Sequence, residues 1–429
     1  MLQTGLIPNA HNDLVTDASY DFYGLRLATC SLDQRIKVWQ LDETNGTWAV
    51  ESEWKAHDAA ISKVCWAHPE FGTILASSSF DRTVKVWEQI PATESDAPQV
   101  NGSGGAVLTS KWVERAMLVD AKGTVRAIEF APQHFGLKLA SISSDNQLRV
   151  YDCLEQPSLT TWQMAEEVDV LNLPSGSRSN NNTANVATPT QQPSTTPEAA
   201  SASLVAHALQ QQQQQQGQPA RSGSGNREAD GGWCLSWCKD RYWGELIAAG
   251  CGASGVVKII QLTQSRRPFT VLTLDPSPSQ TSTNDASGKN APASDGDTPT
   301  PFAITSVAWA PSCGRSYHLI ATGGRDGRVR IWRVRPPLPS DELDGEPDGD
   351  ASEGKWSASI VGDFDDHKSA VGRVEWNITG TILSSAGNDG RVRLWKMTVG
   401  NVWRPAGHIS VEQADEQQAD VDMDADAED

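Results

Sequence analysis

One recurring pattern constrains the fold of this chain more than any other feature. A short apolar run leads to an Asp, and a β-rich run then ends on an aromatic residue six positions after that Asp. Five copies keep this spacing: Leu27 to Asp33 to Trp39, Leu75 to Asp81 to Trp87, Leu139 to Asp145 to Tyr151, Ile320 to Asp326 to Trp332, and Leu383 to Asp389 to Trp395. A sixth, degenerate copy covers residues 246–260 and lacks both the Asp and the final Trp. Repetition of one unit along a chain predicts a repeat protein.

Each copy predicts two strands joined by a tight turn. Asp-Gly at 326 and at 389 is a hairpin signal, and Asp145-Asn146 is a weaker one. Alternating runs that end on an aromatic residue precede four of the copies, at 61–66, 125–130, 304–309 and 371–376, and a fourth run follows, as at 47–54 and 356–361. Four strands per unit make a propeller blade. The sequence therefore predicts an all-β propeller of six four-stranded blades over residues 10–410.

Low-complexity segments interrupt the repeats. They cover residues 91–110, 171–231, 275–300 and 336–354, and the second contains seven consecutive Gln at 210–216. Residues 411–429 form an acidic tail with nine Asp and Glu and no Lys or Arg. Because such segments cannot bury a core, we expect all of them to be disordered. Insertions in repeat proteins map to loops on one face, so that placement is expected here too.

The charge balance excludes several classes of function. Lys and Arg number 35 against 54 Asp and Glu, for a net charge of −19, so the basic footprint that nucleic acids and anionic membranes require is missing. The acidic tail and residues 340–354 account for sixteen of these charges, so the blades are nearly neutral. No apolar run reaches the roughly 18 residues of a membrane span, and the first ten residues do not resemble a signal peptide. We expect a soluble intracellular protein that neither binds nucleic acid nor spans a membrane.

Several short motifs resemble reactive or ligand-binding sites but are better explained as parts of the fold. The seven Cys are odd in number and irregularly spaced, which argues against a disulfide framework, and Cys234-x-x-x-Cys238 lacks the second pair that zinc needs. Gly323-Gly324-x-Asp326-Gly327 lies between two strands, whereas a phosphate loop precedes a helix. Four Arg between 328 and 335 are read as one solvated strand face that could grip an acidic partner. We expect no catalytic residues, no metal and no cofactor.

The repeats resemble those of the WD-repeat family. In that family a loop His, a strand Ser or Thr, the turn Asp and the Trp form one hydrogen-bonded network, in which the His and hydroxyl supply donors to a buried carboxylate. Three complete sets match: His11, Thr29, Asp33, Trp39; His57, Ser77, Asp81, Trp87; and His367, Ser385, Asp389, Trp395. Two partial sets lack the His: Ser141, Asp145, Tyr151 and Thr322, Asp326, Trp332. Asp120 and Pro301 lie near the missing positions, so these two networks are predicted to be shorter. The recurrence of the same set blade by blade argues against a Ser-His-Asp catalytic triad, because catalytic constellations are not normally repeated in this way.

Longer stretches resemble the Sec-thirteen/Seh group of scaffold WD-repeat proteins. They include Trp66-Ala-His-Pro-Glu-Phe-Gly72, its echo at 130–136, and the closing Asp389-Gly-Arg-Val-Arg-Leu-Trp-Lys396. The residues at 11–15, 21–30, 79–83 and 314–318 favour the nucleoporin branch of that group. The resemblance covers about residues 10–405 and leaves out the long insertions and the acidic tail.

This resemblance implies a non-catalytic scaffold subunit of the Y-shaped nuclear pore subcomplex at the nuclear envelope, supporting transport of protein and mRNA. Its partner would be an α-solenoid nucleoporin that donates a blade to an open ring. The group is also shared with a nutrient-sensing complex, SEA/GATOR, at the vacuolar or lysosomal surface, which would supply a second solenoid partner. A vesicle-coat cage subunit and a substrate adaptor of an enzyme complex stay open as alternatives.

The residues at the two ends of the repeats also predict an open ring. WD rings close when the segment before the first blade supplies the outer strand of the last blade, but here that segment is short and contains Gly5 and Pro8. Pro cannot donate a hydrogen bond to a strand ladder. Residues 401–408 follow the last copy and can serve as the outer strand of their own blade. Each terminal blade therefore completes itself, and we expect nothing to lock one to the other.

Overall fold

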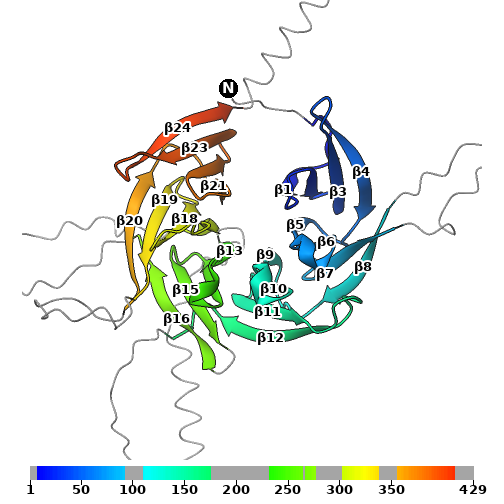
Figure 1. Ribbon diagram of the computed structural model, residues 1–429, viewed down its shortest axis with the longest axis horizontal. Helices are drawn as coiled ribbons and strands as arrows, with labels where there is room; N and C mark the ends of the chain where they lie inside the picture. The colour runs from blue at the N-terminus through cyan, green and yellow to red at the C-terminus, as the bar shows by residue number, and fades with distance from the viewer. Residues whose placement is uncertain are drawn as a thin grey trace, which may run out of the picture. The chain divides into compact units, whose positions relative to one another are not determined.

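The computed structural model describes residues 7–91, 110–174, 231–263, 266–276, 302–337 and 355–410. Apart from a few flanking residues, the predicted insertions and the acidic tail lie outside these residues. The described chain forms 24 strands arranged as six antiparallel four-stranded sheets, each made of four consecutive strands. The prediction of an all-β propeller with six four-stranded blades is confirmed, and Figure 1 shows the blades following one another in chain order around a central axis.

Each blade is a meander in which every strand pairs with the next. Blade one consists of β1 Val15–Tyr20, β2 Arg26–Ser31, β3 Arg35–Asp42 and β4 Thr47–Lys55, and blade two of β5 Ile61–Trp66, β6 Ile74–Ser79, β7 Val84–Ile90 and β8 Lys111–Leu118. Blade three consists of β9 Val125–Phe130, β10 Lys138–Ser143, β11 Gln147–Cys153 and β12 Trp162–Asp169, and blade four of β13 Gly232–Trp237, β14 Leu246–Gly252, β15 Val257–Thr263 and β16 Arg266–Leu274. Blade five consists of β17 Ile304–Trp309, β18 His318–Gly324, β19 Val329–Arg335 and β20 Ser357–Phe364, and blade six of β21 Val371–Trp376, β22 Ile382–Gly387, β23 Arg391–Met397 and β24 Trp403–Ser410.

The turn residues of the repeat explain how each second strand meets its third. The residue after the turn Asp has a left-handed backbone, with φ of 76° at Gly327 and 71° at Gly390. Glycine adopts this conformation without a steric cost, and Asn146 reaches it at 66° because Asn tolerates the region better than most residues. Three short 3₁₀ turns follow the first strands of blades two to four: η1 Pro69–Phe71, η3 Gln133–Phe135 and η4 Arg241–Trp243. The described residues contain no helix long and apolar enough to cross a membrane.

The insertions leave the blades from both faces of the propeller. Residues 92–109 join β7 to β8 and residues 338–354 join β19 to β20, so these two segments connect the third and fourth strands of a blade. Residues 175–230 and 277–301 instead connect one blade to the next. In an antiparallel meander these two kinds of connection lie at opposite strand ends. The expectation that all insertions share one face is therefore wrong.

Hydrophobic packing lies between blades rather than inside any one of them. Each sheet buries apolar residues against its neighbours, and the buried residues form five clusters, one for each pair of consecutive blades. Between blades one and two, for example, Ile36 and Val38 pack against Ile61, Leu75 and Trp87. No cluster among the described residues joins blade six to blade one. The ring is open at this position, which Figure 1 shows between the blue and the orange-red blades.

Three blades contain a complete four-residue network. In blade two, Trp87 Nε1 donates to the Ser77 hydroxyl at 2.9 Å, His57 Nε2 lies 2.8 Å from that hydroxyl, and His57 Nδ1 lies 2.9 Å from Asp81. A carboxylate only accepts, so Nδ1 carries the proton and Nε2 accepts from the serine. The same contacts join His11, Thr29, Asp33 and Trp39 in blade one and His367, Ser385, Asp389 and Trp395 in blade six.

Arginine replaces the missing histidine in blades three and five. Arg149 Nη2 donates to Asp145 at 2.8 Å, and Arg330 Nη2 donates to Asp326 at 2.7 Å, each Arg lying four residues after its Asp. In blade five Trp332 still donates to Thr322 at 3.1 Å. In blade three Ser141 and Tyr151 are buried, and the turn Asp is bound by Arg149 and Ser143. Arg thus supplies the turn Asp with donors that His supplies elsewhere, but no contact among the described residues joins this Asp to the strand hydroxyl in these two blades.

The turn carboxylates are held in their ionised form. Burial alone would raise the pKa of Asp145, but bonds from Arg149, Ser143 and the backbone of Gln147 lower this pKa to about 2. For Asp81 the same opposing effect of burial is outweighed by bonds from His57 and Thr83, and its pKa falls well below the usual range. For Asp389, bonds from Arg393 and His367 outweigh the effect of burial, and the pKa of this carboxyl also falls well below the usual range. Burial also lowers the pKa of His367, although the bond from this ring to Asp389 opposes that shift.

We predict that the longest insertion contributes nothing to folding. Replacing residues 175–228 by a Gly-Ser linker of about ten residues should leave the melting temperature nearly unchanged, because loop closure depends only weakly on loop length, about 0.6 kcal/mol per doubling. Thermal unfolding followed by circular dichroism tests this. A loss of soluble protein, or a large drop in melting temperature, would contradict the prediction.

A turn Asp should contribute to stability through its network. We expect Asp81→Ala to lower the free energy of unfolding by about 1–3 kcal/mol, because the His57 ring and the Thr83 hydroxyl lose an acceptor in a largely buried place. Asp58→Ala is the matched control, since that side chain is 93% exposed and pairs only with Lys55. Urea unfolding measures both. Equal effects of the two substitutions would show that the network is energetically unimportant.

The same groups predict how stability depends on pH. The folded pKa values of Asp81, Asp145 and Asp389 lie below the unfolded value of about 3.9, so their stabilisation is complete above that pH and is lost as the pH falls toward about 2. The pKa of His367 is also lower in the folded state, so the unfolded chain takes up this proton first as the pH drops below about 6.5. Urea unfolding at pH 7, 5 and 3 should show a small loss and then a larger one. A flat profile would contradict this reading.

Candidate docking surface at the open junction

Hydroxyl side chains on the innermost strands join one blade to the next. Thr16 donates to the carbonyl of Ile61 at 2.7 Å, and Ser62 donates to the carbonyl of Val125 at 2.6 Å. Thr305 makes the same bond to Val371. Each hydroxyl is the second residue of its inner strand, and each acceptor is the first residue of the next one. A hydroxyl side chain at this position of the inner strand therefore links neighbouring blades at three of the junctions.

A tryptophan at the end of the inner strand makes a second bond in the opposite direction. The indole N–H of Trp66 donates to the carbonyl of Ser19 at 2.9 Å, that of Trp237 to Glu129 at 3.1 Å, and that of Trp376 to Ala308 at 3.0 Å. Each of these carbonyls belongs to the preceding blade. The bulky indole therefore packs at the junction and also satisfies a backbone acceptor there.

Both bonds are missing at the open junction, which we define as the space between blade six and blade one. The second residue of β21 is Gly372 rather than Ser or Thr, and the last residue of β1 is Tyr20 rather than Trp. A Cβ at Gly372 would meet its nearest neighbours only at 3.7 Å, so lack of space does not explain the glycine. Both residues went unnoticed in the sequence, because the second and last positions of the inner strands vary among the blades: Arg126 and Trp233 also replace the hydroxyl, and Phe130 also replaces the Trp.

The flank of blade six is the face of its sheet that points into the open junction. Residues paired directly across antiparallel strands project to the same side, which assigns to this flank Arg373, Glu375, Ile382, Ser384, Ala386, Val392, Leu394, Lys396, Arg404, Gly407 and Ile409. Val392 is 37% exposed. The corresponding residues of the other five blades, Ile36, Val84, Leu148, Val257 and Val329, are at most 2% exposed. Only blade six leaves this apolar position without a cover.

Blade one presents the opposite flank. Tyr20 pairs with Leu27, Leu27 with Trp39, and Trp39 with Val50, so these four side chains share the face that looks into the open junction. Tyr20 is 59% exposed and Val50 is 49% exposed, and the Tyr20 ring lies 5.8 Å from the ring of Trp48. Two exposed apolar flanks that face one space are unusual on a soluble protein and indicate an interaction site.

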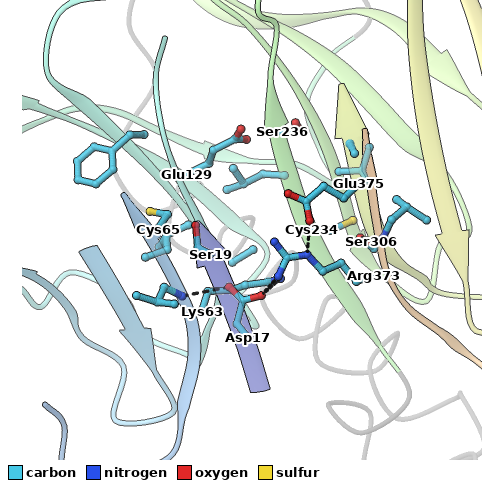
Figure 2. Close-up of a pocket in the computed structure, with 18 of the residues that line it drawn as sticks. Asp17, Ser19, Lys63, Cys65, Glu129, Cys234, Ser236, Ser306, Arg373 and Glu375 are labelled. Atoms are coloured by element: carbon cyan, nitrogen blue, oxygen red, sulfur yellow. Dashed lines mark hydrogen bonds and ion pairs between the residues drawn. The ribbon is translucent and has the colours of Figure 1, made fainter. Parts of the chain in front are cut away.

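A single buried carboxylate links the two sides of the open junction. Asp17 in β1 accepts from Lys63 of blade two at 3.1 Å and from the backbone N–H of Val64 at 3.2 Å. Arg373 of blade six also donates to this carboxylate and, at 2.7 Å, to the carbonyl of Ala18. Figure 2 shows Arg373 reaching across to Asp17 while it also contacts Glu375. This ion pair lies where the junctions of blades one and two and of blades five and six have both a hydroxyl and an indole bond.

The inner strands surround a central cavity of about 730 Å³. Its lining mixes charges of both signs, and most of these are paired: Lys63 and Arg373 with Asp17, and Lys239 with Glu129. None of the network residues of the blades lies in it, and the described residues contain no cluster of three His, Cys, Asp or Glu that could hold a metal.

The other sequence motifs lie within the blades. Cys234 and Cys238 are buried in the cluster between blades four and five, and burial raises the pKa of each thiol to about 12. The Arg run of β19 does not form one solvated face, contrary to prediction. Arg330 is buried against Asp326, Arg328 pairs with Asp363 at 2.9 Å, and Arg333 lies over the ring of Tyr317.

Comparison with protein families agrees with the repeat. The model of the WD domain, G-beta repeat, matches residues 3–40, 48–88, 298–333 and 358–396. These segments fall on blades one, two, five and six. Blades three and four are not matched. Blade three has Tyr151 in place of the Trp, and blade four is the degenerate copy. The family therefore supports a structural protein built from WD repeats rather than an enzyme.

Relatives align with nearly the whole chain. The nucleoporin SEH1 of Saccharomyces cerevisiae is 33% identical, over 94% of this chain and 99% of its own length. The nucleoporin seh1 of Schizosaccharomyces pombe is 32% identical, over 96% of this chain and 97% of its own length. The human nucleoporin SEH1 is 32% identical, over 92% of this chain and 85% of its own length. At this identity and coverage, the chain belongs to the nucleoporin SEH1 family of WD-repeat proteins.

Proposed function

We propose that this chain is a non-catalytic scaffold subunit of the nuclear pore complex. In this role it binds an α-solenoid nucleoporin of the Y-shaped subcomplex, whose own strands fill the open junction, and the assembly supports transport of protein and mRNA at the nuclear envelope. The exposure of Val392, compared with its five buried counterparts, is the observation that carries the proposal. The names of the relatives, all nucleoporins, point to the same assembly.

The chemistry of the open junction specifies how such a partner binds. Apolar flanks on both sides favour a segment that is apolar on both of its faces, as a blade is. Main-chain hydrogen bonds among the donated strands themselves would satisfy their backbone groups, and burial of Val392, Val50 and Tyr20 would supply affinity. The inserted strands would then play the part that a seventh blade plays in a closed ring.

The same surface would serve in a nutrient-sensing complex of the SEA/GATOR type at the vacuolar or lysosomal membrane. One open junction accommodates one donated blade. A given copy of the chain would therefore belong to one assembly or the other, and never to both at once.

We predict that a charge on the flank of blade six blocks the partner. Val392→Asp should reduce co-purification of the solenoid partner by about tenfold or more, because a carboxylate would be buried without a counter-charge. Val399→Asp is the control, since Val399 is fully exposed in the turn before β24 and lies off the flank. Both variants are isolated from cells by affinity purification, and bound proteins are quantified by mass spectrometry.

The identity of the stoichiometric partner decides between assemblies. A solenoid nucleoporin that is lost only from the Val392→Asp variant supports the proposal. If the stoichiometric partner is instead a coat-cage subunit, the chain belongs to a vesicle coat. If it is an enzyme, the chain is a substrate adaptor. Undiminished binding of the solenoid partner to Val392→Asp would show that the open junction is not the docking surface.

A further inference from the structure

The flank of every blade ends in a row of three side chains, one each from the second, third and outer strands. The row lies at the strand ends next to the loop between the first two strands, and we call it the end row. Because residues paired across antiparallel strands project to the same side, each end row faces the following blade. From blade one to blade six, the end rows are Arg26, Gln40 and Ala49; Ile74, Glu88 and Val113; Lys138, Asp152 and Gln163; Leu246, Gln261 and Phe269; Leu319, Arg333 and Ser359; and Ile382, Lys396 and Arg404.

Cations in two of these rows bind the following blade. Lys138 of blade three donates to Glu245 of blade four at 2.8 Å. The guanidinium of Arg26 in blade one lies 5.1 Å from the ring centre of Trp66 in blade two, and it also pairs with Glu51 of its own blade at 2.8 Å. An end-row cation therefore reaches across the junction to the next blade.

Two other charged end rows find partners within their own blade. Glu88 of blade two pairs with Arg115 at 2.7 Å, and Arg333 of blade five lies over the ring of Tyr317. The end row of blade four contains no charged residue. In the first five blades, every charge of an end row thus has a described partner.

The end row of blade six differs from all of these. Lys396 lies directly opposite Arg404, and both side chains are exposed on the open junction. Neither cation has an ion pair or an aromatic ring beside it in the part of the chain that the structure describes. Like charges directly opposite each other destabilise a sheet, so this pair opposes folding of its own blade. A counter-charge from the missing seventh blade would remove that repulsion.

We propose that the strands donated to the open junction bring two carboxylates to this row, one to Lys396 and one to Arg404. The inference rests on the proposed function and deepens it, because it states the charge that the partner carries at this place. The contact between Lys138 and Glu245 is the model for it. A ring serves at Arg26 because Glu51 already neutralises that guanidinium, whereas two adjacent cations need negative charge.

These carboxylates would decide which segment binds. The apolar centre of the flank, around Val392, accepts any apolar strand of suitable size. A segment with neutral or basic residues at the end row would leave two partly buried cations unpaired, and it would be rejected for that reason. The end row also fixes which way the donated strands run, because their acidic end must meet Lys396 and Arg404.

Zero-length cross-linking of the complex purified from cells tests the contact. A carbodiimide joins Lys396 to a carboxylate only when the two are in contact, and peptide mass spectrometry identifies both residues. We expect a link from Lys396 to an Asp or Glu of the solenoid partner. The link between Lys85 and Glu114, whose side chains are 2.9 Å apart within blade two, is the internal reference.

Charge reversal tests the energetic role. A chain with Lys396→Glu and Arg404→Glu is expressed beside a differently tagged wild-type chain, so that both compete for one pool of partner. The variant should recover about tenfold less partner, because carboxylates would then face carboxylates. The matched control is Lys122→Glu with Lys368→Glu, which makes the same change of net charge at two exposed loop positions off the flank and should compete equally. Changing the cross-linked partner carboxylate to Lys should restore binding of the reversed chain.

The free chain separates binding from folding. Lys396→Glu alone places opposite charges across from each other on β23 and β24, so this variant should melt no lower than the wild type. Partner recovery should nevertheless fall. A lower melting temperature would mean that Lys396 serves the fold of blade six, which would overturn the proposal.

Two further results would overturn it. One is a reference link without any link from Lys396 to the partner, including the case in which Lys396 links only to its own chain or to a second copy. The other is equal recovery of partner by the reversed chain and the wild type. If Val392→Asp loses the solenoid partner in the same experiments, the proposed function survives either result. If Val392→Asp keeps that partner, the proposed function fails first and this inference fails with it.

Discussion

Burial of blade faces against neighbouring blades is the interaction on which this structure depends. A four-stranded sheet with apolar residues on both faces cannot bury either face by itself. Five of the six junctions solve this with a hydrophobic cluster, and the contacts of Thr16, Ser62, Thr305 and three Trp supplement that packing. The sixth junction lacks the cluster and these bonds, so its two flanks remain partly exposed. These two flanks are the surface that the proposed partner would cover.

The ion pair at the open junction has a different physical character from the contacts elsewhere. Hydroxyl and indole bonds are short-range and need the blades in close contact, whereas attraction between Asp17 and Arg373 acts over a longer distance. It can hold blades one and six in register near the axis while their outer strands stay apart. Lys63 binds the same carboxylate, so the pair is also anchored to blade two. These ion pairs therefore fix the position of blade six relative to blades one and two near the central axis.

Much of the fold was predictable because the repeat encodes it. The spacing from Asp to the aromatic residue located the second and third strands, and the alternating runs at 61–66, 125–130, 304–309 and 371–376 coincide with inner strands. Arg149 and Arg330 escaped notice, because the motif places its donor upstream in a loop and these residues come four positions downstream on a strand. Tyr20 and Gly372 were missed for another reason: each is ordinary by itself, and its importance comes from the open junction, which only the arrangement of the blades reveals.

The connections of the two terminal blades are all short. Within blades one and six, every strand is joined to the next by a few residues, and the same holds for the link from β4 to β5 and from β20 to β21. The long insertions fall in blades two and five, or between blades three, four and five. A large domain attached to strands in the open junction would thus meet no long loop on the blades beside it. Such a domain could therefore contact the surfaces of blades one and six directly, without a long loop of these blades between them.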